Sequence, residues 1–201
     1  MKLYYATGAC SLSPHIVLCE LGLPHQTMKV STKTKKMDDG GDYLQINPKG
    51  YVPTLELDDG QRLTEGPAIV QYLADKVPAA KLAPPNGSME RYRLQEWLNF
   101  ITSELHKQFS PLFNPATPEE VKEAQKVKLR GRFDWVNEQL KGKDYLMGSQ
   151  FTVADAYLYT VLRWAGPTGI DLAKWPVLAQ YVGRVAARPQ VQAALKAEGL
   201  S

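Results

Sequence analysis

The sequence predicts a mixed α/β domain followed by an all-helical domain. Up to about residue 78, short strand and helix patterns alternate in the order βαβ-(α)-ββα. A Pro-Pro-Asn-Gly run at 84–87 then interrupts the chain, and no strand pattern follows it. We therefore expect an α/β domain at 1–80, a linker at 81–87 and a helical domain at 88–201.

Each element of the N-terminal part has its own local signal. Lys2 to Ala6 reads as a strand, and a helix is expected over 11–21 with Gly22 as its C-cap. Thr27 to Val30 reads as the next strand. A loop that is first basic and then rich in Gly and Asp is expected over 31–41, and a single helical turn over 43–46.

The stretch from Tyr51 to Gly66 organises this domain. Two strands, 54–57 and 61–64, flank the turn pair Asp59-Gly60, which predicts a hairpin. Glu65-Gly66-Pro67 then opens a helix, since Pro suits the first helical position. Free N–H groups and the positive end of the helix dipole are therefore expected there, which makes a place for an anionic group.

Val52-Pro53 precedes the first hairpin strand. Proline cannot donate to a sheet ladder, so the backbone N–H and C=O of Val52 are expected to be open to an extended peptide ligand.

The C-terminal part reads as helices only. One helix is expected over 88–110, and a second opens with Thr117-Pro118-Glu119-Glu120, which fits a capping box. A third opens at Thr152, with Asp155 completing a capping box. Further helices are expected from Pro176 and over 191–197.

Composition limits the function classes. The chain has 201 residues, 44% hydrophobic and 22% charged, with a net charge of +3 and no basic block, so nucleic-acid binding is not implied. No apolar run could span a membrane, and no signal-peptide pattern is present. Two cysteines make no disulfide framework, so we expect a protein of the reducing cytoplasm.

Cys10 is a candidate for a reactive thiol. It follows a strand and stands at a helix start, where the helix dipole favours thiolate over thiol. Cys10 to Ser13 also has the C-x-x-S form of a redox thiol. The alternative is a small buried cysteine without a chemical role, and for Cys19 we favour that interpretation.

On the first C-terminal helix, Asn99, Ser103 and His106 fall at i, i+4 and i+7, roughly opposite the apolar stripe, with Lys107 beside them. This pattern fits either a solvated face or a polar site. The three histidines show no metal-ligand spacing and the cysteines lie nine apart, so no metal is expected. Nucleotide-binding loops and a nucleophile elbow are not found.

Over its whole length the chain resembles the bacterial beta-class glutathione transferases. The matching stretches are Gly8-Ala9-Cys10-Ser11, Asn47-Pro48-Lys49-Gly50-x-Val52-Pro53, Leu63-Thr64-Glu65-Gly66, Glu96-Trp97-Leu98-Asn99, Glu104-Leu105-His106-Lys107 and Phe151-Thr152-Val153-Ala154-Asp155-Ala156-Tyr157. Cys10 together with the run from Glu104 to Lys107 points to the beta class.

This resemblance implies a thioredoxin-like N-terminal domain, a C-terminal α-helical bundle domain, a cis bond before Pro53 and a homodimer. Glutathione would be the co-substrate, with no prosthetic group. The implied glutathione-binding residues are Ala9, Cys10, Lys35, Val52, Pro53, Glu65, Gly66, Asn99, Ser103, Glu104 and His106. The implied catalytic residues are Cys10, His106 and Lys107, with Tyr5 and Ser11 as further candidates near the place where other classes keep a catalytic hydroxyl.

Gly66 departs from the wider superfamily, in which serine is frequent at this position, so a hydroxyl contact is lost there. Phe109, Phe113 and Trp164 are expected to line an apolar co-substrate pocket. The first hypothesis for function is glutathione transfer to small apolar electrophiles. Thiol–disulfide exchange through Cys10 is the second, and a non-catalytic carrier of apolar ligands is the alternative.

Overall fold

The computed structural model describes residues 1–200, which form two compact units. Unit 1 consists of Met1–Lys81 together with the chain from Ala187 onward, and unit 2 is Leu82–Ala186. The division after residue 81 lies close to the one expected from the Pro-Gly-rich run. The last helix, expected in the helical domain, packs with unit 1 instead.

Unit 1 is built on a four-stranded sheet with the order β2-β1-β3-β4. The strands are β1 (Lys2–Tyr5), β2 (Gln26–Lys29), β3 (Thr54–Glu56) and β4 (Arg62–Thr64). β1 and β2 are parallel and joined through a helix, whereas β3 is antiparallel to both β1 and β4. Leu55 opposes Leu3 on one side and Leu63 on the other, so this register puts apolar residues side by side.

The hairpin between β3 and β4 is confirmed. Its turn is closed by hydrogen bonds from Gly60 N–H to the carbonyl of Leu57, at 3.0 Å, and from Leu57 N–H to the carbonyl of Gln61, at 2.8 Å. Gly60 has a φ of +84°, which a residue with a Cβ rarely adopts. The turn chemistry therefore explains why the chain reverses here and delivers β4 to the start of the next helix.

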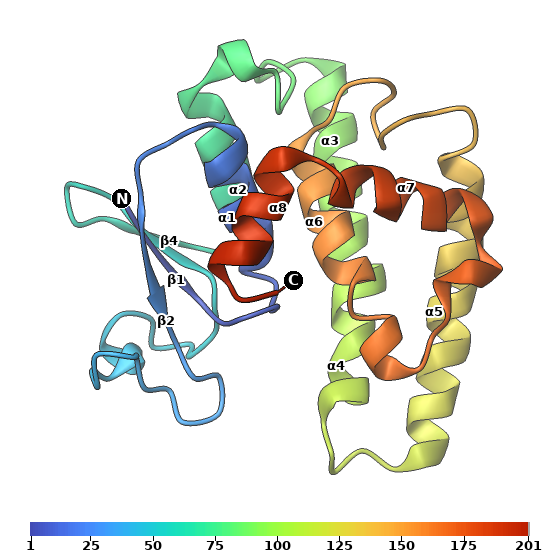
Figure 1. Ribbon diagram of the computed structural model, residues 1–201, viewed down its shortest axis with the longest axis horizontal. Helices are drawn as coiled ribbons and strands as arrows, with labels where there is room; N and C mark the ends of the chain where they lie inside the picture. The colour runs from blue at the N-terminus through green and yellow to red at the C-terminus, as the bar shows by residue number, and fades with distance from the viewer. Residues whose placement is uncertain (201) are drawn as a thin grey trace. The chain divides into compact units, whose positions relative to one another are not determined.

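Three helices cover the sheet of unit 1: α1 (Leu12–Glu20), α2 (Gly66–Lys76) and α8 (Pro189–Ala197). They lie on one side of the sheet, and α1 packs between α2 and α8 (Figure 1). Each fully buried aliphatic side chain contributes about 1.5–3 kcal/mol. The aliphatic residues without any exposed surface include Leu3, Leu12, Ile16, Val17, Leu18, Leu55, Ile69, Val70 and Leu73.

Two polar links attach the C-terminal segment to α1. Arg188 holds Glu20 through Nε and a terminal nitrogen, at 2.7 and 2.8 Å. Nδ1 of His15 lies 2.9 Å from Oε1 of Glu198, and both side chains are buried. Helix periodicity does not reveal which neighbour a short helix packs against. The sequence therefore carries no signal that this segment leaves the helical domain and joins unit 1.

Unit 2 contains α3 (Met89–Phe100), α4 (Lys107–Phe113), α5 (Glu119–Gln139), α6 (Val153–Leu162) and α7 (Pro176–Ala186). Every residue of α6 is buried, so this helix forms the centre of the unit. The sequence predicted one helix over 88–110. In the structure a π-helical segment, η3 (Ile101–His106), separates α3 from α4. The described residues 1–200 contain no helix with the length and apolar character needed to cross a membrane.

The two predicted capping boxes have different outcomes. The box at α6 is present, and the Asp155 carboxylate accepts from the backbone N–H of Thr152 at 2.8 Å. The box at Thr117 was a wrong prediction. Pro118 has an extended ψ of 146°, so it occupies the N-cap position itself and leaves Thr117 outside the helix.

Candidate active site

The segment before β3 presents its backbone in a defined position. The Val52–Pro53 peptide bond is cis, as the resemblance implied. The carbonyl of Tyr51 accepts hydrogen bonds from the Tyr43 hydroxyl and from Nδ2 of Asn47, both at 2.8 Å. Among residues 1–200, the backbone N–H of Val52 has no hydrogen-bond partner. An extended backbone could therefore pair with Val52 without displacing an existing contact.

Cys10 lies against this segment. Its thiol donates to the carbonyl of Val52, with Sγ 3.2 Å from the oxygen, and the side chain is half-buried. The residue belongs to the turn that joins β1 to α1. Ala9 is part of the same turn, since its N–H donates to the carbonyl of Ala6 and its own carbonyl accepts from Leu12. The sequence placed Cys10 at a helix start, and the structure puts it one residue before the N-cap Ser11.

The Ser11 hydroxyl is both an acceptor and a donor of hydrogen bonds within the same turn. The buried hydroxyl accepts from the N–H of Ala6 at 3.1 Å and donates to the carbonyl of Ala6 at 3.2 Å. A hydroxyl engaged in this way fixes the turn and has no free proton to give to a ligand. A catalytic role for Ser11 therefore finds no support in this geometry.

Tyr5 is mostly buried at the end of β1 and packs against the His15 ring, with 6.0 Å between ring centroids. Burial, with the carboxylates of Glu198 and Asp38 adding to it, raises the pKa of the Tyr5 phenol. The hydroxyl therefore stays protonated at neutral pH and could act as a hydrogen-bond donor. Its catalytic role stays a prediction.

Glu65 and Gly66 form the junction of β4 and α2. Glu65 has a φ of 67°, which is uncommon for a residue with a side chain and is often found at functional sites. The N–H groups of Ala68 and Ile69 both donate to the carbonyl of Glu65, whereas that of Gly66 has no partner among residues 1–200. The predicted helix start is therefore present with an unpaired N–H and a carboxylate beside it, and its binding of an anionic group stays a prediction.

Two lysines add positive charge to this region. Nζ of Lys49 lies 2.5 Å from Oε1 of Glu65 and 2.8 Å from Oγ1 of Thr64. Nζ of Lys35 donates to the carbonyl of Gly50 at 2.8 Å and lies 5.7 Å from the centre of the Tyr51 ring. Lys49 was missed as a site residue. It stands in the Asn47-Pro48-Lys49-Gly50 run, but its pairing with Glu65, sixteen residues away, has no signal in the local sequence.

In unit 2, His106 ends the π-helical segment. Its Nδ1 lies 2.7 Å from the Tyr157 hydroxyl, and its ring packs edge-on against Trp164 at 4.9 Å between centroids. Short π-helical segments are rare and often occur at functional sites. Tyr157 ends the Phe151–Tyr157 stretch that resembles the family, but the sequence gives no signal for its contact with His106.

The stripe expected from helical spacing is only partly formed. Asn99 and Ser103 are exposed, and the Ser103 hydroxyl donates to the carbonyl of Asn99 at 3.1 Å. His106 is half-buried against Tyr157 and Trp164, because the wider π-helical turn rotates it away from the α-helical phase.

Two neighbours of His106 were also predicted as site residues. Glu104 accepts from Nε and a terminal nitrogen of Arg132, at 2.8 and 2.7 Å, so its charge is already paired within unit 2. Lys107 is exposed. Their roles in glutathione binding and catalysis stay predictions.

The three residues predicted for an apolar pocket come together. Trp164 lies 5.7 Å from Phe109 and 5.7 Å from Phe113, measured between ring centroids. Phe109 has no exposed surface and supports the cluster from inside, whereas Phe113 is 52% exposed. Phe113 can therefore contact an apolar molecule directly, Trp164 can do so only through the 9% of its surface that is exposed, and Phe109 cannot.

The similarities to known proteins agree with this arrangement. The glutathione S-transferase N-terminal domain family matches residues 7–76, and the C-terminal domain family matches residues 100–189. The chain is 50% identical over 200 residues to glutathione S-transferase GstA of Escherichia coli O157:H7, with 100% of both chains covered.

Solved structures that are similar over 100% of both chains include two from sphingomonads. The bacterial beta class glutathione S-transferase of Sphingomonas chungbukensis has a TM-score of 0.97 at 48% identity. A sphingomonad glutathione S-transferase complexed with glutathione has a TM-score of 0.96 at 49% identity. The thioredoxin-like domain and the helical domain are thereby confirmed. The chain belongs to the glutathione S-transferase family, and its predicted likeness to the bacterial beta class is confirmed.

Proposed function

We propose that this protein transfers the thiolate of glutathione to small apolar electrophiles. One observation carries the proposal: the unpaired N–H of Val52 precedes a cis-proline, and the Cys10 thiol contacts the carbonyl of the same residue. A cysteinyl residue paired with Val52 in an extended conformation would bring its own sulfur to Cys10. Glutathione is a tripeptide with a central cysteine, so it matches this arrangement.

The two ends of glutathione have chemical complements in unit 1. Its γ-glutamyl end carries an ammonium and a carboxylate, which we assign to the Glu65 carboxylate and the Gly66 N–H. Lys49 already pairs with the Glu65 carboxylate. In the complex, the carboxylate would interact with both the Lys49 ammonium and the ammonium of the ligand. We assign the glycine carboxylate to Lys35, whose ammonium lies at the segment leading to Val52.

The reaction is a nucleophilic substitution or addition. In the substitution, the glutathione thiolate forms a carbon–sulfur bond with the electrophile while the leaving group departs with its electron pair. Stabilising the thiolate lets the reaction start from the reactive form at neutral pH. The Cys10 thiol, which donates to the Val52 carbonyl in the free protein, could donate to the glutathione thiolate instead. We assign the apolar part of the electrophile to Phe113 and Trp164, with Phe109 packed against both rings from inside.

A homodimer is part of this proposal. Unit 2 carries an aromatic group on α3 and α5, in which the Trp135 ring lies 4.6 Å from Phe100 and 5.2 Å from Trp97. Trp135 is 44% exposed, and aromatic residues are enriched in protein interfaces. Light scattering on the purified protein tests this assignment: twice the mass of 22.4 kDa supports it, and the monomer mass contradicts it.

Conjugation is tested by incubating the purified protein with glutathione and a panel of aryl halides, epoxides and chlorinated aromatics. We expect thioether products detectable by mass spectrometry, formed faster than in the absence of protein. A lack of acceleration across the panel would contradict the transferase proposal. Calorimetry with S-methylglutathione separates binding from chemistry, because this analogue cannot react.

Thiol–disulfide exchange is a second candidate, favoured by the half-buried Cys10 thiol at the proposed cysteinyl position. The Cys10 thiolate would attack oxidised glutathione, forming a mixed disulfide and releasing one glutathione thiolate; a second thiol would then restore Cys10. Intact-mass measurement after treatment with oxidised glutathione decides the matter. One reductant-sensitive glutathionyl mass supports exchange, and no added mass contradicts it.

The carrier function left open by the sequence is not favoured, because the relatives are transferases by name. Turnover in the conjugation assay also separates the two, since a carrier binds apolar dyes without consuming glutathione.

A further inference from the structure

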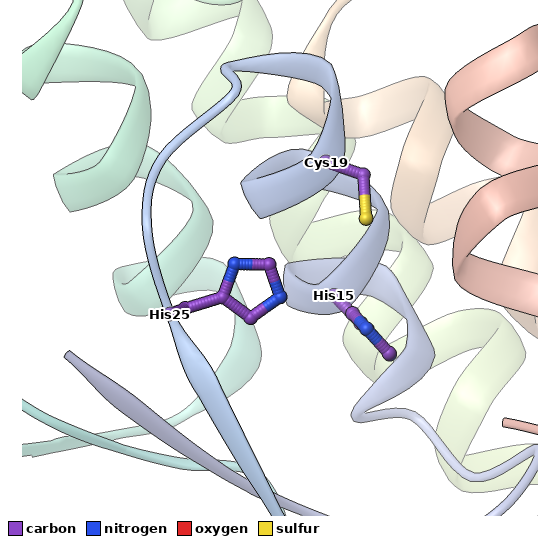
Figure 2. Close-up of side chains that lie close together, drawn as sticks. All are labelled: His15, Cys19 and His25. Carbon is purple, nitrogen blue, oxygen red and sulfur yellow. The ribbon is translucent and has the colours of Figure 1, made fainter. Parts of the chain in front are cut away.

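Unit 1 contains a second cluster of reactive side chains, formed by His15, Cys19 and His25. One ligand atom from each residue lies within 4.8 Å of the other two. Figure 2 shows the Cys19 sulfur and the His15 ring on the same side of α1, with the His25 ring turned toward them. We propose that these three residues bind a divalent transition-metal ion, with Zn²⁺ as the expected ion.

The local fold explains why the three residues meet. His15 and Cys19 are four apart on α1, so they share one face of the helix. The helix then ends in a tight reversal: the N–H of Leu23 donates to the carbonyl of Leu18 at 3.1 Å, and Gly22 has a φ of +61°. The reversal directs the chain back along α1, which brings His25 beside the helix just before β2 starts.

Both histidines have the hydrogen bonds that metal-binding histidines usually make. Nδ1 of His15 lies 2.9 Å from the Glu198 carboxylate, and Nδ1 of His25 lies 2.7 Å from the carbonyl of Leu23. A carboxylate and a carbonyl can only accept, so each Nδ1 donates, and Nε2 is the atom left to bind a metal in the neutral form of each ring. Such partners orient the ring and raise its basicity as a ligand.

The charges of the cluster suit a dication. A Cys19 thiolate and the buried Glu198 carboxylate carry two negative charges, and Glu198 is also held by the N–H of Gly8 at 2.9 Å. The metal–sulfur bond forms as the Cys19 thiol releases its proton to solvent, so the step balances without an oxidant. Two imidazoles and a thiolate fit Zn²⁺, whereas Mg²⁺ and Ca²⁺ prefer oxygen ligands.

The three ligand atoms must move slightly closer together to bind one ion, because they lie within 4.8 Å of one another in the free protein. Tetrahedral Zn²⁺ with bonds of about 2.1 Å to nitrogen and 2.3 Å to sulfur separates its ligand atoms by roughly 3.5 Å. Cys19 and His25 are half-buried, so their side chains have room to approach His15, which Glu198 holds in place. Three protein ligands leave a fourth position for water, which can enter because Cys19 and His25 are partly open to solvent.

The experiment uses the full chain, stripped with a chelator and kept free of glutathione, which binds metals itself. Zn²⁺ is titrated in competition with a chromophoric chelator, and Co²⁺ serves as a spectroscopic probe of thiolate ligation. We expect one ion per chain, a thiolate-to-cobalt charge-transfer band and a raised melting temperature with Zn²⁺. Cys19→Ser and His25→Gln should each weaken binding by about tenfold or more.

The matched control is Cys10→Ser, because Cys10 is the other of the two cysteines in the chain. This variant should keep both the cobalt band and the affinity. The proposal is overturned if Cys19→Ser and His25→Gln bind like the unmodified protein, or if Cys10→Ser alone abolishes binding. His15→Gln also breaks the link to Glu198, so it could lose metal binding by unfolding. Its metal affinity is therefore interpreted only if circular dichroism shows that the variant is folded. None of these outcomes depends on transferase activity.

Discussion

The thiol of Cys10 donates to the carbonyl of Val52, with 3.2 Å between sulfur and oxygen. These residues are 42 positions apart in the sequence, and the contact joins the turn before α1 to the cis-proline segment before β3. The carbonyl is a temporary partner in our proposal, because a bound glutathione thiolate would compete for the same S–H group. The proposed chemistry of unit 1 depends on this contact.

Cys10→Ala should therefore separate the two proposed activities. The variant cannot form a mixed disulfide with oxidised glutathione, while conjugation should fall only about two- to tenfold, the value of one ordinary hydrogen bond. Cys10→Ser keeps a donor and should lose less conjugation than the alanine variant. Steady-state kinetics measures the conjugation rate, and intact mass shows whether the mixed disulfide forms. A complete loss of conjugation in Cys10→Ser would instead mean that the sulfur itself enters the reaction.

Gly66→Ser should strengthen glutathione binding. A Cβ placed on Gly66 meets no atom within 4 Å, so the added side chain fits without rearrangement. Its hydroxyl can contact the γ-glutamyl carboxylate, and we expect KM for glutathione to fall about two- to tenfold. Gly66→Ala adds the Cβ without the hydroxyl and should leave KM near its original value. Equal effects of the two substitutions would rule out the hydroxyl as the cause.

Glu65→Gly should raise stability and lower affinity at the same time. Glycine adopts the φ of 67° at this position without strain, so the free energy of unfolding should rise by about 1 kcal/mol. The lost carboxylate should raise KM for glutathione by about tenfold or more, since hydrogen bonds to charged groups contribute about 1.5–3 kcal/mol.

Glu65→Gln is the control for this substitution, because it keeps the strained backbone and removes only the charge. It should raise KM without raising the free energy of unfolding, measured by urea denaturation. If Glu65→Gln binds glutathione as well as the unmodified protein, the assignment of the ligand ammonium to Glu65 is wrong.

His106→Phe should test the predicted catalytic role of this residue. The substitution keeps a ring against Trp164 and removes the contact with the Tyr157 hydroxyl. If His106 acts on the thiolate, kcat for conjugation should fall about tenfold or more, with a stability cost of about 1 kcal/mol. Tyr157→Phe breaks the same contact from the other side and should cost similar stability. Equal losses of kcat in both variants would indicate a positioning role.

Asp155→Asn should destabilise unit 2. The buried carboxylate accepts from the N–H groups of Leu146 and Thr152 and from the hydroxyl groups of Thr152 and Tyr181. An amide offers only one acceptor atom, so at least one buried donor loses its partner, and we expect a loss of about 3 kcal/mol.

Tyr181→Phe is the milder comparison for Asp155→Asn. Burial, followed by the Asp155 charge, holds the pKa of the Tyr181 phenol well above its usual range, so the phenol stays neutral and donates one hydrogen bond to the Asp155 carboxylate. Removing this bond should lower the free energy of unfolding, measured by urea denaturation, by about 1.5 kcal/mol, the low end for a hydrogen bond to a charged group. If Tyr181→Phe loses as much free energy of unfolding as Asp155→Asn, the other hydrogen bonds of Asp155 contribute nothing, which would contradict this interpretation.

Much of the fold was predictable because its signals are local. The Asp59-Gly60 hairpin, the Thr152 capping box and the Pro-Gly-rich division near residue 81 each depend on side chains close to the backbone they shape. The π-helical segment over Ile101–His106 was not predictable in this way. An α-helical and a π-helical turn differ in which backbone carbonyl each N–H reaches, and the local residue pattern carries no signal for that difference. The position of α8 against α1 depends on Arg188 and Glu198 finding partners far along the chain.

By itself the sequence determined the order of elements, the family resemblance and the residue types available for chemistry. Only the tertiary structure decided which of them meet. It put the Cys10 thiol on the Val52 carbonyl, paired Lys49 with Glu65 and gathered His15, Cys19 and His25, three residues whose spacing predicted no metal site. The physical reason is that local propensity acts over a few residues, whereas side-chain chemistry depends on distances set by the packing of the whole unit.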